Sequence, residues 1–389
     1  LSLGVTGTAT GAEVLTVVPA DATSIYDASG NAASTSQSNN TVNLNDKTAP
    51  TISITAVNSA NATVSDGATS NDGTLTLTFT ASEATTNFIK DDITVAGGTL
   101  GDLSGSGTTY TATFTPSASG ATTIDVGASF TDAAGNTNTA ATQFNWTYDG
   151  ALPTISSVTL GSDNTSLTVN FSEDVFDTDG GSGDLEAADF ALSKTGGSAT
   201  IGATPTGVSK TNATTYVLTF TTGGTATGAE VVTVKPAGAT SIYDASGNAA
   251  SASQSVGNTV NLNDKTAPTL SAISIASSNS TSTLAKVNDV VTLSFTASET
   301  IATPVVTFLS GGEAINDTTV TYANTGNTHT AKYTANTLDT AGAVTFSIAF
   351  ADTAGNSGTA VTATSNSTAV TFDKAAPTMT ITAAEVSDG

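Results

Sequence analysis

Short runs in which apolar and polar residues alternate occur along nearly the whole chain. Residues 75–79 read Leu-Thr-Leu-Thr-Phe, and residues 110–114 read Tyr-Thr-Ala-Thr-Phe. A period of two places alternate side chains on opposite faces, so each run predicts a β-strand with one buried face. Segments rich in glycine and serine, such as 104–107, separate the runs and predict turns. The pattern therefore predicts an all-β protein built from short strands.

The predicted strands fall into groups of domain size. Residues 269–373 follow the same plan as residues 50–149, and residues 154–264 are a variant with a longer acidic loop after the second strand. About seven short strands in about 100 residues is typical of an immunoglobulin-like (Ig-like) β-sandwich. We therefore predict tandem Ig-like β-sandwich modules in an elongated array. Within 50–149 the strands are expected at 52–54, 75–79, 93–95, 110–114, 123–126 and 143–146.

A short proline-containing element separates these groups. Asp-Lys-Thr-Ala-Pro occurs at 46–50 and again at 264–268, with a near copy at 373–377 and a looser one at 149–153. Proline fixes its own φ and keeps the preceding residue out of the helical region, so each element predicts a short, extended linker. The modules are then 47–149, 150–264 with the acidic loop, and 265–373.

Both ends of the sequence repeat parts of these modules. Residues 13–31 match residues 230–248 almost residue for residue, so 1–46 is expected to be the C-terminal part of a truncated module. Residues 374–389 echo the segment after Pro50 and are expected to begin a further module. Repetition at this period indicates a tandem array.

Charge and composition exclude several classes of partner. The chain has 33 acidic and 9 basic residues, a net charge of −24, whereas nucleic-acid binding requires clustered Lys and Arg. Cysteine is absent, so no disulfide is expected, and no apolar run approaches the ~18 residues of a membrane span. An acidic, lysine-poor surface suits divalent cations.

Certain acidic residues recur at fixed places in each module. An Asp lies in each linker, a Glu follows the second strand, and an Asp-x-x-Gly-Asn motif follows a later strand. In an Ig-like topology the loops after these two strands lie at the end where the linker joins the module, so the residues are expected to converge. The three expected groups are Asp46, Glu83, Asp132 and Asn136; Asp149, Glu173, Asp244 and Asn248; and Asp264, Glu299, Asp352 and Asn356.

Each group offers three carboxylates and an amide oxygen, which are ligands for a hard cation. Ca²⁺ takes ~6–8 oxygens, and backbone carbonyls or water would complete the shell. The alternative is that Asp-x-x-Gly-Asn is only a tight turn, capped by Asp and closed by Gly and Asn. Coincidence with the Glu and the linker Asp in each module favours Ca²⁺ as a bound ion.

The acidic loop 177–186 is a further candidate for oxygen ligation. Its spacing differs from that of an EF-hand, and a solvated acidic loop is the alternative. The candidate ligands there are Asp177, Asp179, Asp184 and Glu186.

No pattern of catalytic residues is found, and we predict that the segment is not an enzyme. The chain has one histidine, His329, which we expect at an exposed strand position. Asp91 and Asp92 are a pair, but adjacent residues on a strand point to opposite faces, so they are poor partners for acid–base chemistry. There is no phosphate-binding glycine loop, nucleophile elbow or thiol.

The motifs resemble those of a known family. Phe-Thr-Ala-Ser-Glu ending at Glu83 and Glu299, the Asp-x-x-Gly-Asn motifs and the Asp-Lys-Thr-Ala-Pro linkers resemble bacterial Ig-like repeats of large surface adhesins. Residues 154–264 are similar to repeats of swimming-type cell-surface proteins. The resemblance implies a stalk or extender segment of a long, secreted bacterial cell-surface protein, whose partners are the neighbouring modules of the same chain. Two alternatives are a filament subunit completed by strand exchange with copies of itself, and a glycan- or ligand-binding Ig-like module.

Overall fold

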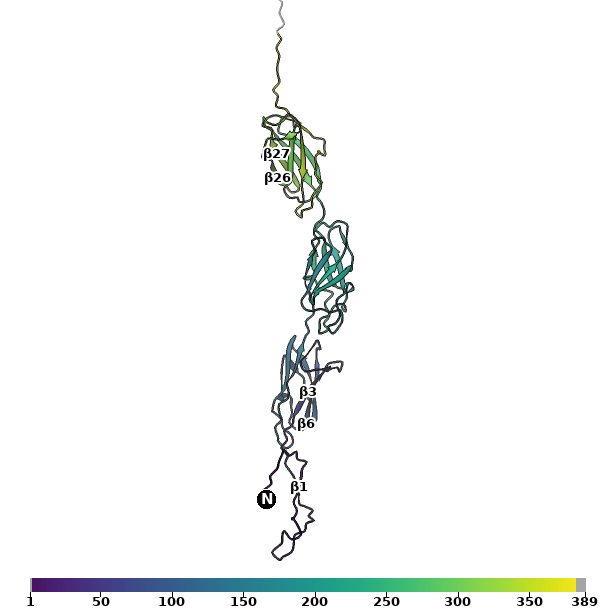
Figure 1. Cartoon of the computed structure of the whole chain (residues 1–389), viewed down its shortest axis with the longest axis vertical. Helices are drawn as coiled ribbons and strands as arrows, with labels where there is room; N and C mark the ends of the chain where they lie inside the picture. The colour runs from purple at the N-terminus through teal and green to yellow at the C-terminus, as the bar shows by residue number, and fades with distance from the viewer. Residues whose placement is uncertain (1, 383–389) are drawn as a thin grey trace, which may run out of the picture.

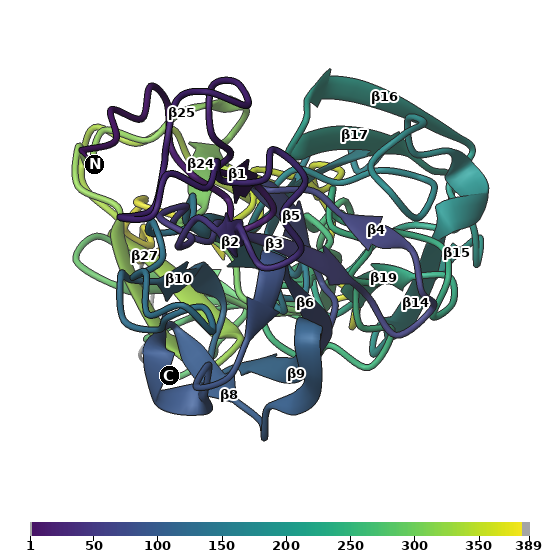
Figure 2. The same ribbon diagram turned by 90° about the horizontal axis from the view of Figure 1, so that it is seen from below.

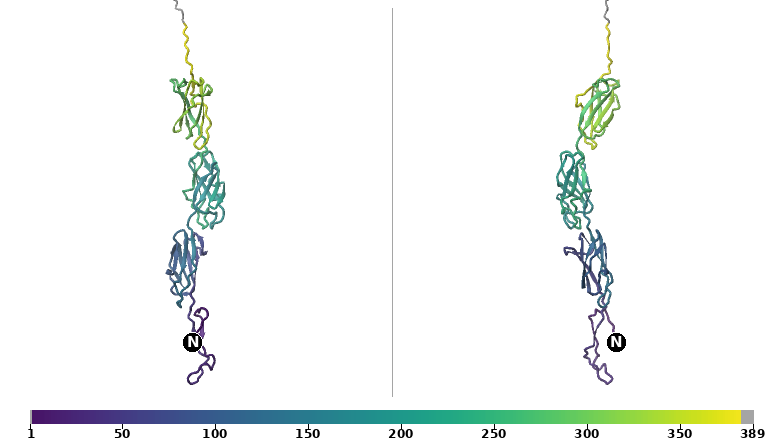
Figure 3. Two further views of the ribbon diagram at one scale, coloured as in Figure 1. Left: turned by 60° about the vertical axis from the view of Figure 1, so that its left-hand side comes forward. Right: turned by 180° about the vertical axis from the view of Figure 1, so that it is seen from behind.

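The structure, a computed structural model, describes residues 2–382. Strands make up nearly all of its regular structure, and the helical elements are two 3₁₀ turns, η1 (Lys90–Asp92) and η2 (Ala187–Asp189), in the described residues. Three β-sandwiches follow one another along the long axis (Figure 1), and two further views show the same row (Figure 3). Seen along that axis, the sandwiches overlap one another (Figure 2). The predicted fold class, all-β tandem Ig-like sandwiches in an elongated array, is confirmed.

The first sandwich packs a five-stranded sheet, β4-β3-β6-β9-β8, against a four-stranded sheet, β5-β11-β10-β7. All neighbouring pairs are antiparallel except β11 with β5, which are parallel. Its strands are β3 (Ile52–Val57), β4 (Thr63–Val64), β5 (Ala68–Ser70), β6 (Leu75–Thr85), β7 (Ile93–Ala96), β8 (Gly98–Leu100), β9 (Ser104–Pro116), β10 (Gly120–Val126) and β11 (Phe144–Tyr148).

The second sandwich has sheets β12-β13-β17-β16 and β14-β19-β20, with a small pair β15-β18. Its strands are β12 (Ile155–Leu160), β13 (Ser166–Phe171), β14 (Phe190–Thr195), β15 (Thr200–Ile201), β16 (Gly207–Asn212), β17 (Thr215–Thr219), β18 (Thr222–Gly223), β19 (Val231–Pro236) and β20 (Thr259–Asn261).

The third sandwich has sheets β21-β23-β27-β26 and β22-β29-β28-β24-β25, which repeat the plan of the first. Its strands are β21 (Leu270–Ser277), β22 (Leu284–Ala285), β23 (Val290–Ala297), β24 (Val305–Ser310), β25 (Glu313–Ala314), β26 (Thr321–Thr325), β27 (Thr328–Thr334), β28 (Gly342–Ala349) and β29 (Val370–Phe372).

Each sandwich has its own buried core, and the alternation of apolar and polar residues along each strand determines which side chains belong to it. On β6, Leu75, Leu77 and Phe79 are fully buried, whereas the threonines between them are not. Trp146 on β11 is also buried. The three apolar clusters lie within residues 52–146, 155–262 and 273–372 and share no residue. Each sandwich is therefore stabilised by its own core.

The two end segments lack such a core. Residues 2–46 form one antiparallel pair, β1 (Val14–Thr16) with β2 (Thr41–Asn43), and the apolar side chains of Val14 and Tyr26 are more than half exposed. Residues 374–382 contain no strand, and the rest of the segment predicted to begin a further module, 383–389, lies outside the described residues. No helix of the described chain is both long enough and apolar enough to span a membrane.

Two details differ from the sequence-based prediction. Glu83 lies within β6 and not after it, because β6 continues past Phe79 to Thr85. His329 is buried, with 8% of its surface exposed, because the alternation on β27 places it on the inner face with Ala331 and Tyr333.

Candidate metal centres

Three carboxylates meet at each of three joints. One oxygen from each of Asp46, Glu83 and Asp132 lies within 4.8 Å of the other two, and the sets Asp149–Glu173–Asp244 and Asp264–Glu299–Asp352 have the same arrangement. In each set the linker Asp and the Glu are partly buried and the Asp of the turn is buried. The structure thus brings the predicted carboxylates together at all three joints.

The linker Asp is held to the sandwich that precedes it. At the third joint the Lys265 N–H and the Thr266 hydroxyl both donate to the carbonyl of Ala226, each at 2.9 Å. The Thr266 N–H donates to Asp264 Oδ1 at 2.8 Å, which fixes the carboxylate orientation. Thr48 and Asp46 make the same contact at the first joint, also at 2.8 Å.

The Glu is positioned by the serine before it. The Ser298 N–H donates to the Thr269 carbonyl, and the Thr269 N–H donates to Ser298 Oγ, both at 2.9 Å. These bonds tie the residue after the linker proline to the residue before Glu299. Ser82 with Thr51 and Ser172 with Thr154 form equivalent pairs. The sequence analysis missed these positioning serines, although the repeated Ser-Glu dipeptide was the signal that could have found them.

The Asp of the turn is fixed by backbone and side-chain donors. At the third joint the Asn356 N–H donates to Asp352 Oδ1 at 2.8 Å, and Asn356 Nδ2 donates to Asp352 Oδ2 at 2.7 Å. Gly355 has φ +94°, a conformation that glycine adopts without strain. The turn therefore holds a buried carboxylate in one orientation.

Each asparagine of the turn donates hydrogen bonds through its amide nitrogen. Asn248 Nδ2 donates to Asp244 Oδ2 at 2.8 Å and to the Asp149 carbonyl at 3.0 Å. Asn356 makes the equivalent bond to the Asp264 carbonyl at 3.2 Å, and Asn136 donates to Asp132 Oδ2 at 2.8 Å. The amide faces the carboxylate with its nitrogen because only a donor can bond an ionised carboxylate. Asn136, Asn248 and Asn356 thus position the carboxylate of the turn, and ligation of an ion by their amide oxygens stays a prediction.

The pKa of the glutamate shifts in the same direction at each joint. Burial, followed by the charges of the two neighbouring aspartates, raises the pKa of Glu83, and the same causes raise the pKa of Glu173 and Glu299. Burial also tends to raise the pKa of Asp132, but hydrogen bonds from Asn136 outweigh it and lower that pKa. The groups repel one another, and a cation between them would relieve the repulsion.

A fourth copy of the turn shows that the turn forms without a carboxylate cluster. In residues 2–46 the Asn31 N–H and Nδ2 donate to the two oxygens of Asp27, each at 2.8 Å, as in the other copies. Asp27 belongs to none of the carboxylate groups in the described chain. The turn alone therefore explains the Asp–Asn contacts but not the convergence of Glu and linker Asp.

The structure does not gather the acidic side chains of the loop as it does those of the joints. No three of them meet in the described chain, and the four predicted ligands are Asp177, Asp179, Asp184 and Glu186. Asp184 forms an ion pair with Lys210 at 2.6 Å, and the loop closes through Thr178 and Ser182. Oxygen ligation by this loop stays a prediction.

The loop lies instead against the turn at the second joint. Gly181, with φ +78°, is packed against Ala245, and Gly247 is packed against the Asp179 carboxylate. On the joint side of the turn, the Ser246 hydroxyl donates to Asp149 Oδ2 at 2.8 Å. The acidic loop thus supports the turn that carries Asp244.

Comparison with known proteins gives a family match for the first sandwich. Residues 46–148 match the model of the bacterial Ig-like domain, and no curated protein matches the chain. Similar solved structures include titin domains I67–I69 (10% identity, TM-score 0.31, covering 84% of this chain and 99% of that one). Invasin, a bacterial integrin-binding protein, is 16% identical (TM-score 0.29), with 76% of this chain and 56% of that one covered. The mouse nectin-like molecule 4 ectodomain is 9% identical (TM-score 0.27), with 81% and 100% covered. Residues 46–148 are thus similar to the bacterial Ig-like domain, and the chain is a tandem array of Ig-like sandwiches.

Proposed function

We propose that the chain is a stalk segment of a long, secreted bacterial surface protein and that Ca²⁺ stiffens its joints. The observation that carries the proposal is the repetition of one carboxylate triad at three joints. A structural core does not require acidic residues at these places, because each sandwich has its own apolar cluster. The triads are instead situated where a linker meets the following sandwich.

The residues present fit Ca²⁺. In the described chain the ion pairs are Lys90–Asp102 and Lys210–Asp184, so the carboxylates of the triads have no basic side chain to neutralise them. Carboxylates are hard oxygen ligands, and Ca²⁺ tolerates irregular shells completed by carbonyls and water. Asp264, Glu299 and Asp352 would hold the ion at the third joint.

The chain's own residues explain how such an ion would act on a joint. Asp264 is tied to the second sandwich through the bonds of Lys265 and Thr266 to Ala226. Glu299 and Asp352 belong to the third sandwich. Bending the joint would separate these carboxylates, so a shared cation would oppose bending, whereas unneutralised carboxylates would favour it.

Calcium titration of the chain should show weak sites that depend on the linker Asp. Extracellular modules bind with Kd ~10⁻⁴–10⁻³ M, so we expect about three sites in this range by equilibrium dialysis. Asp264→Asn should remove one site and leave two, because the other triads are a whole sandwich away. Asp102→Asn is the matched control, because Asp102 is exposed and outside the triads. If the original chain, Asp264→Asn and Asp102→Asn bind the same number of Ca²⁺ ions, the triad carboxylates are turn and linker residues without an ion.

Calcium should also raise the unfolding temperature by mass action. At a free concentration of tenfold Kd the gain is about 1.4 kcal/mol for each site. Differential scanning calorimetry with added Ca²⁺ and with chelator measures the gain. Asp264→Asn should lose part of it, and Asp102→Asn should retain all of it.

A further inference from the structure

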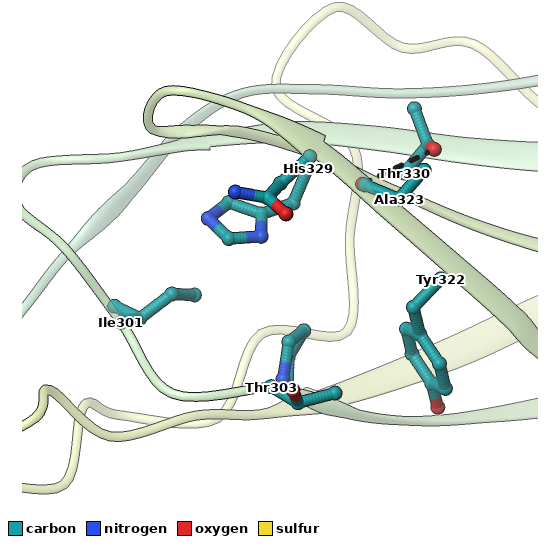
Figure 4. Close-up of a pocket in the computed structure, with 8 residues that line it drawn as sticks. Ile301, Thr303, Tyr322, Ala323, His329 and Thr330 are labelled. Atoms are coloured by element: carbon teal, nitrogen blue, oxygen red, sulfur yellow. Dashed lines mark hydrogen bonds between the residues drawn. The ribbon is translucent and has the colours of Figure 1, made fainter.

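The third sandwich contains an open cavity of about 170 Å³ beside the β26–β27 hairpin. The hairpin contributes Tyr322, Asn324, His329 and Thr330, and the segment 301–304 forms the opposite wall. Figure 4 shows the His329 ring facing the segment that carries Ile301 and Thr303, with the Tyr322 ring at the far side. The cavity lies at the end of the sandwich nearest the third joint, since Ile301 pairs with Asp352 through the backbone.

The first sandwich shows why this space exists. Tyr110 occupies the place of His329, because it pairs with Phe79 as His329 pairs with Phe295. Phe88 packs on Tyr110 with ring centroids 5.1 Å apart and fills that end of the first core. The chain between Glu299 and β24 is shorter than the chain between Glu83 and β7 that carries Phe88. A smaller ring and a shorter loop thus leave the cavity open.

His329 brings unused hydrogen-bonding capacity into the cavity. Its ring stacks on Phe295 at 5.6 Å with an interplanar angle of 10°, and 8% of the residue surface is exposed. No described residue forms a hydrogen bond with the imidazole, which leaves both ring nitrogens available to a ligand. Burial lowers the pKa of His329, so the ring is neutral at neutral pH and offers one donor and one acceptor.

The rest of the lining is uncharged and mixes polar residues with the apolar residues Ile301, Pro304 and Ala323. Thr303, Asn324 and Thr330 add hydroxyl and amide groups, and no Asp, Glu, Lys or Arg lines the cavity. Tyr322 is 39% exposed at the rim, and its hydroxyl oxygen accepts the Val306 N–H at 3.1 Å, which holds the ring in place. This combination suits a neutral ring rich in hydroxyl groups and disfavours an ion.

We propose that this cavity binds one neutral sugar ring, with His329 and Asn324 bonding its hydroxyl groups and Tyr322 contacting its face. A cavity of about 150 Å³ is large enough for a six-membered ring. An apolar ligand would cover the His329 ring nitrogens and leave them without partners, so a ligand with hydroxyl groups that bond them is favoured. The site uses none of the triad carboxylates and does not depend on calcium.

The only histidine of the chain gives a direct readout. The full chain, labelled selectively on histidine, is titrated with methyl α-glucopyranoside, methyl α-galactopyranoside and methyl α-mannopyranoside while the imidazole signals are followed by NMR. At least one sugar should shift them saturably with Kd ~10⁻³ M, as expected for a small ligand. No saturable shift with any of the three sugars would overturn the proposal. A comparable shift with sodium phosphate would overturn the neutral-sugar assignment.

Variants separate a binding role from a structural one. His329→Phe keeps the stack on Phe295 but removes the ring nitrogens, and Asn324→Ala keeps His329. Both should weaken saturation-transfer signals from the bound sugar by about tenfold or more. Thr328→Ala is the control, because Thr328 is exposed on the outer face of β27. This variant should bind the sugar as the original chain does. Thermal melts confirm folding, and normal binding by both folded variants would contradict the proposal.

Discussion

Replacing Trp146 with alanine should unfold the first sandwich and leave the second and third intact. Trp146 is fully buried on β11, where its ring lies 6.2 Å from Phe114 and 5.8 Å from Tyr148. Its Nε1 donates to Ser70 Oγ at 3.0 Å. Removing a buried Trp side chain costs about 3–5 kcal/mol in the free energy of unfolding, a large share of a domain's stability.

Hydrogen exchange measured by mass spectrometry resolves the three sandwiches by their peptides. In Trp146→Ala, we expect loss of protection within residues 52–148 and unchanged protection within 155–262 and 273–372. Phe372→Ala is the mirror variant, because Phe372 is fully buried in the third sandwich and should affect that sandwich alone. Loss of protection throughout the chain in either variant would contradict separate cores.

Replacing Glu230 with glutamine should destabilise the second sandwich by about 2–3 kcal/mol. Glu230 is fully buried and accepts the N–H groups of Ala199 and Thr227 at 2.9 Å each. Gly197 packs directly against the carboxylate and leaves no room for rearrangement. An amide offers one acceptor oxygen in place of two, so one N–H group loses its partner.

The same residue gives the second sandwich a defined response to acid. Burial raises the pKa of Glu230, but the backbone N–H donors outweigh burial and lower the pKa to about 2. A group whose pKa falls on folding stabilises the protein above its ordinary pKa, here 4.5. That stability should be lost as the pH falls from about 4.5 towards 2.

Urea unfolding of the second sandwich at several pH values measures this response. The slope below pH ~4.5 should be smaller in Glu230→Gln than in the original chain. Glu13→Gln is the matched control, because Glu13 accepts the Thr10 N–H in the repeated segment but is exposed, and it should change neither stability nor slope. Equal acid dependence with and without the Glu230 carboxyl group would show that its ionisation does not stabilise the fold.

The architecture could be predicted from local pattern because the period of two is a local property. The rows Leu75–Leu77–Phe79 on β6 and Val291–Leu293–Phe295 on β23 are buried in the structure as the alternation requires. Topology then placed the triads, since the direction of each strand decides at which end its loop lies.

Other features depend on contacts that no local pattern specifies. The orientation of the Asn248 amide follows from the ionised Asp244 beside it and the Asp149 carbonyl. Burial of His329 follows from its register opposite Phe295 and from the length of the loop before β24. The ion pair of the acidic loop illustrates the same limit, because Asp184 lies in the loop and its partner Lys210 lies on β16.

Small-angle X-ray scattering tests the claim that calcium stiffens the joints. Profiles of the whole chain are recorded in millimolar Ca²⁺ and after chelation, with Asp264→Asn beside the original chain. The account predicts a larger maximum dimension and a narrower distribution of shapes in calcium. It also predicts a smaller gain in Asp264→Asn, while hydrogen-exchange protection of each core stays the same. Identical scattering with and without calcium would contradict the claim and leave the triads as turn and linker residues without an ion.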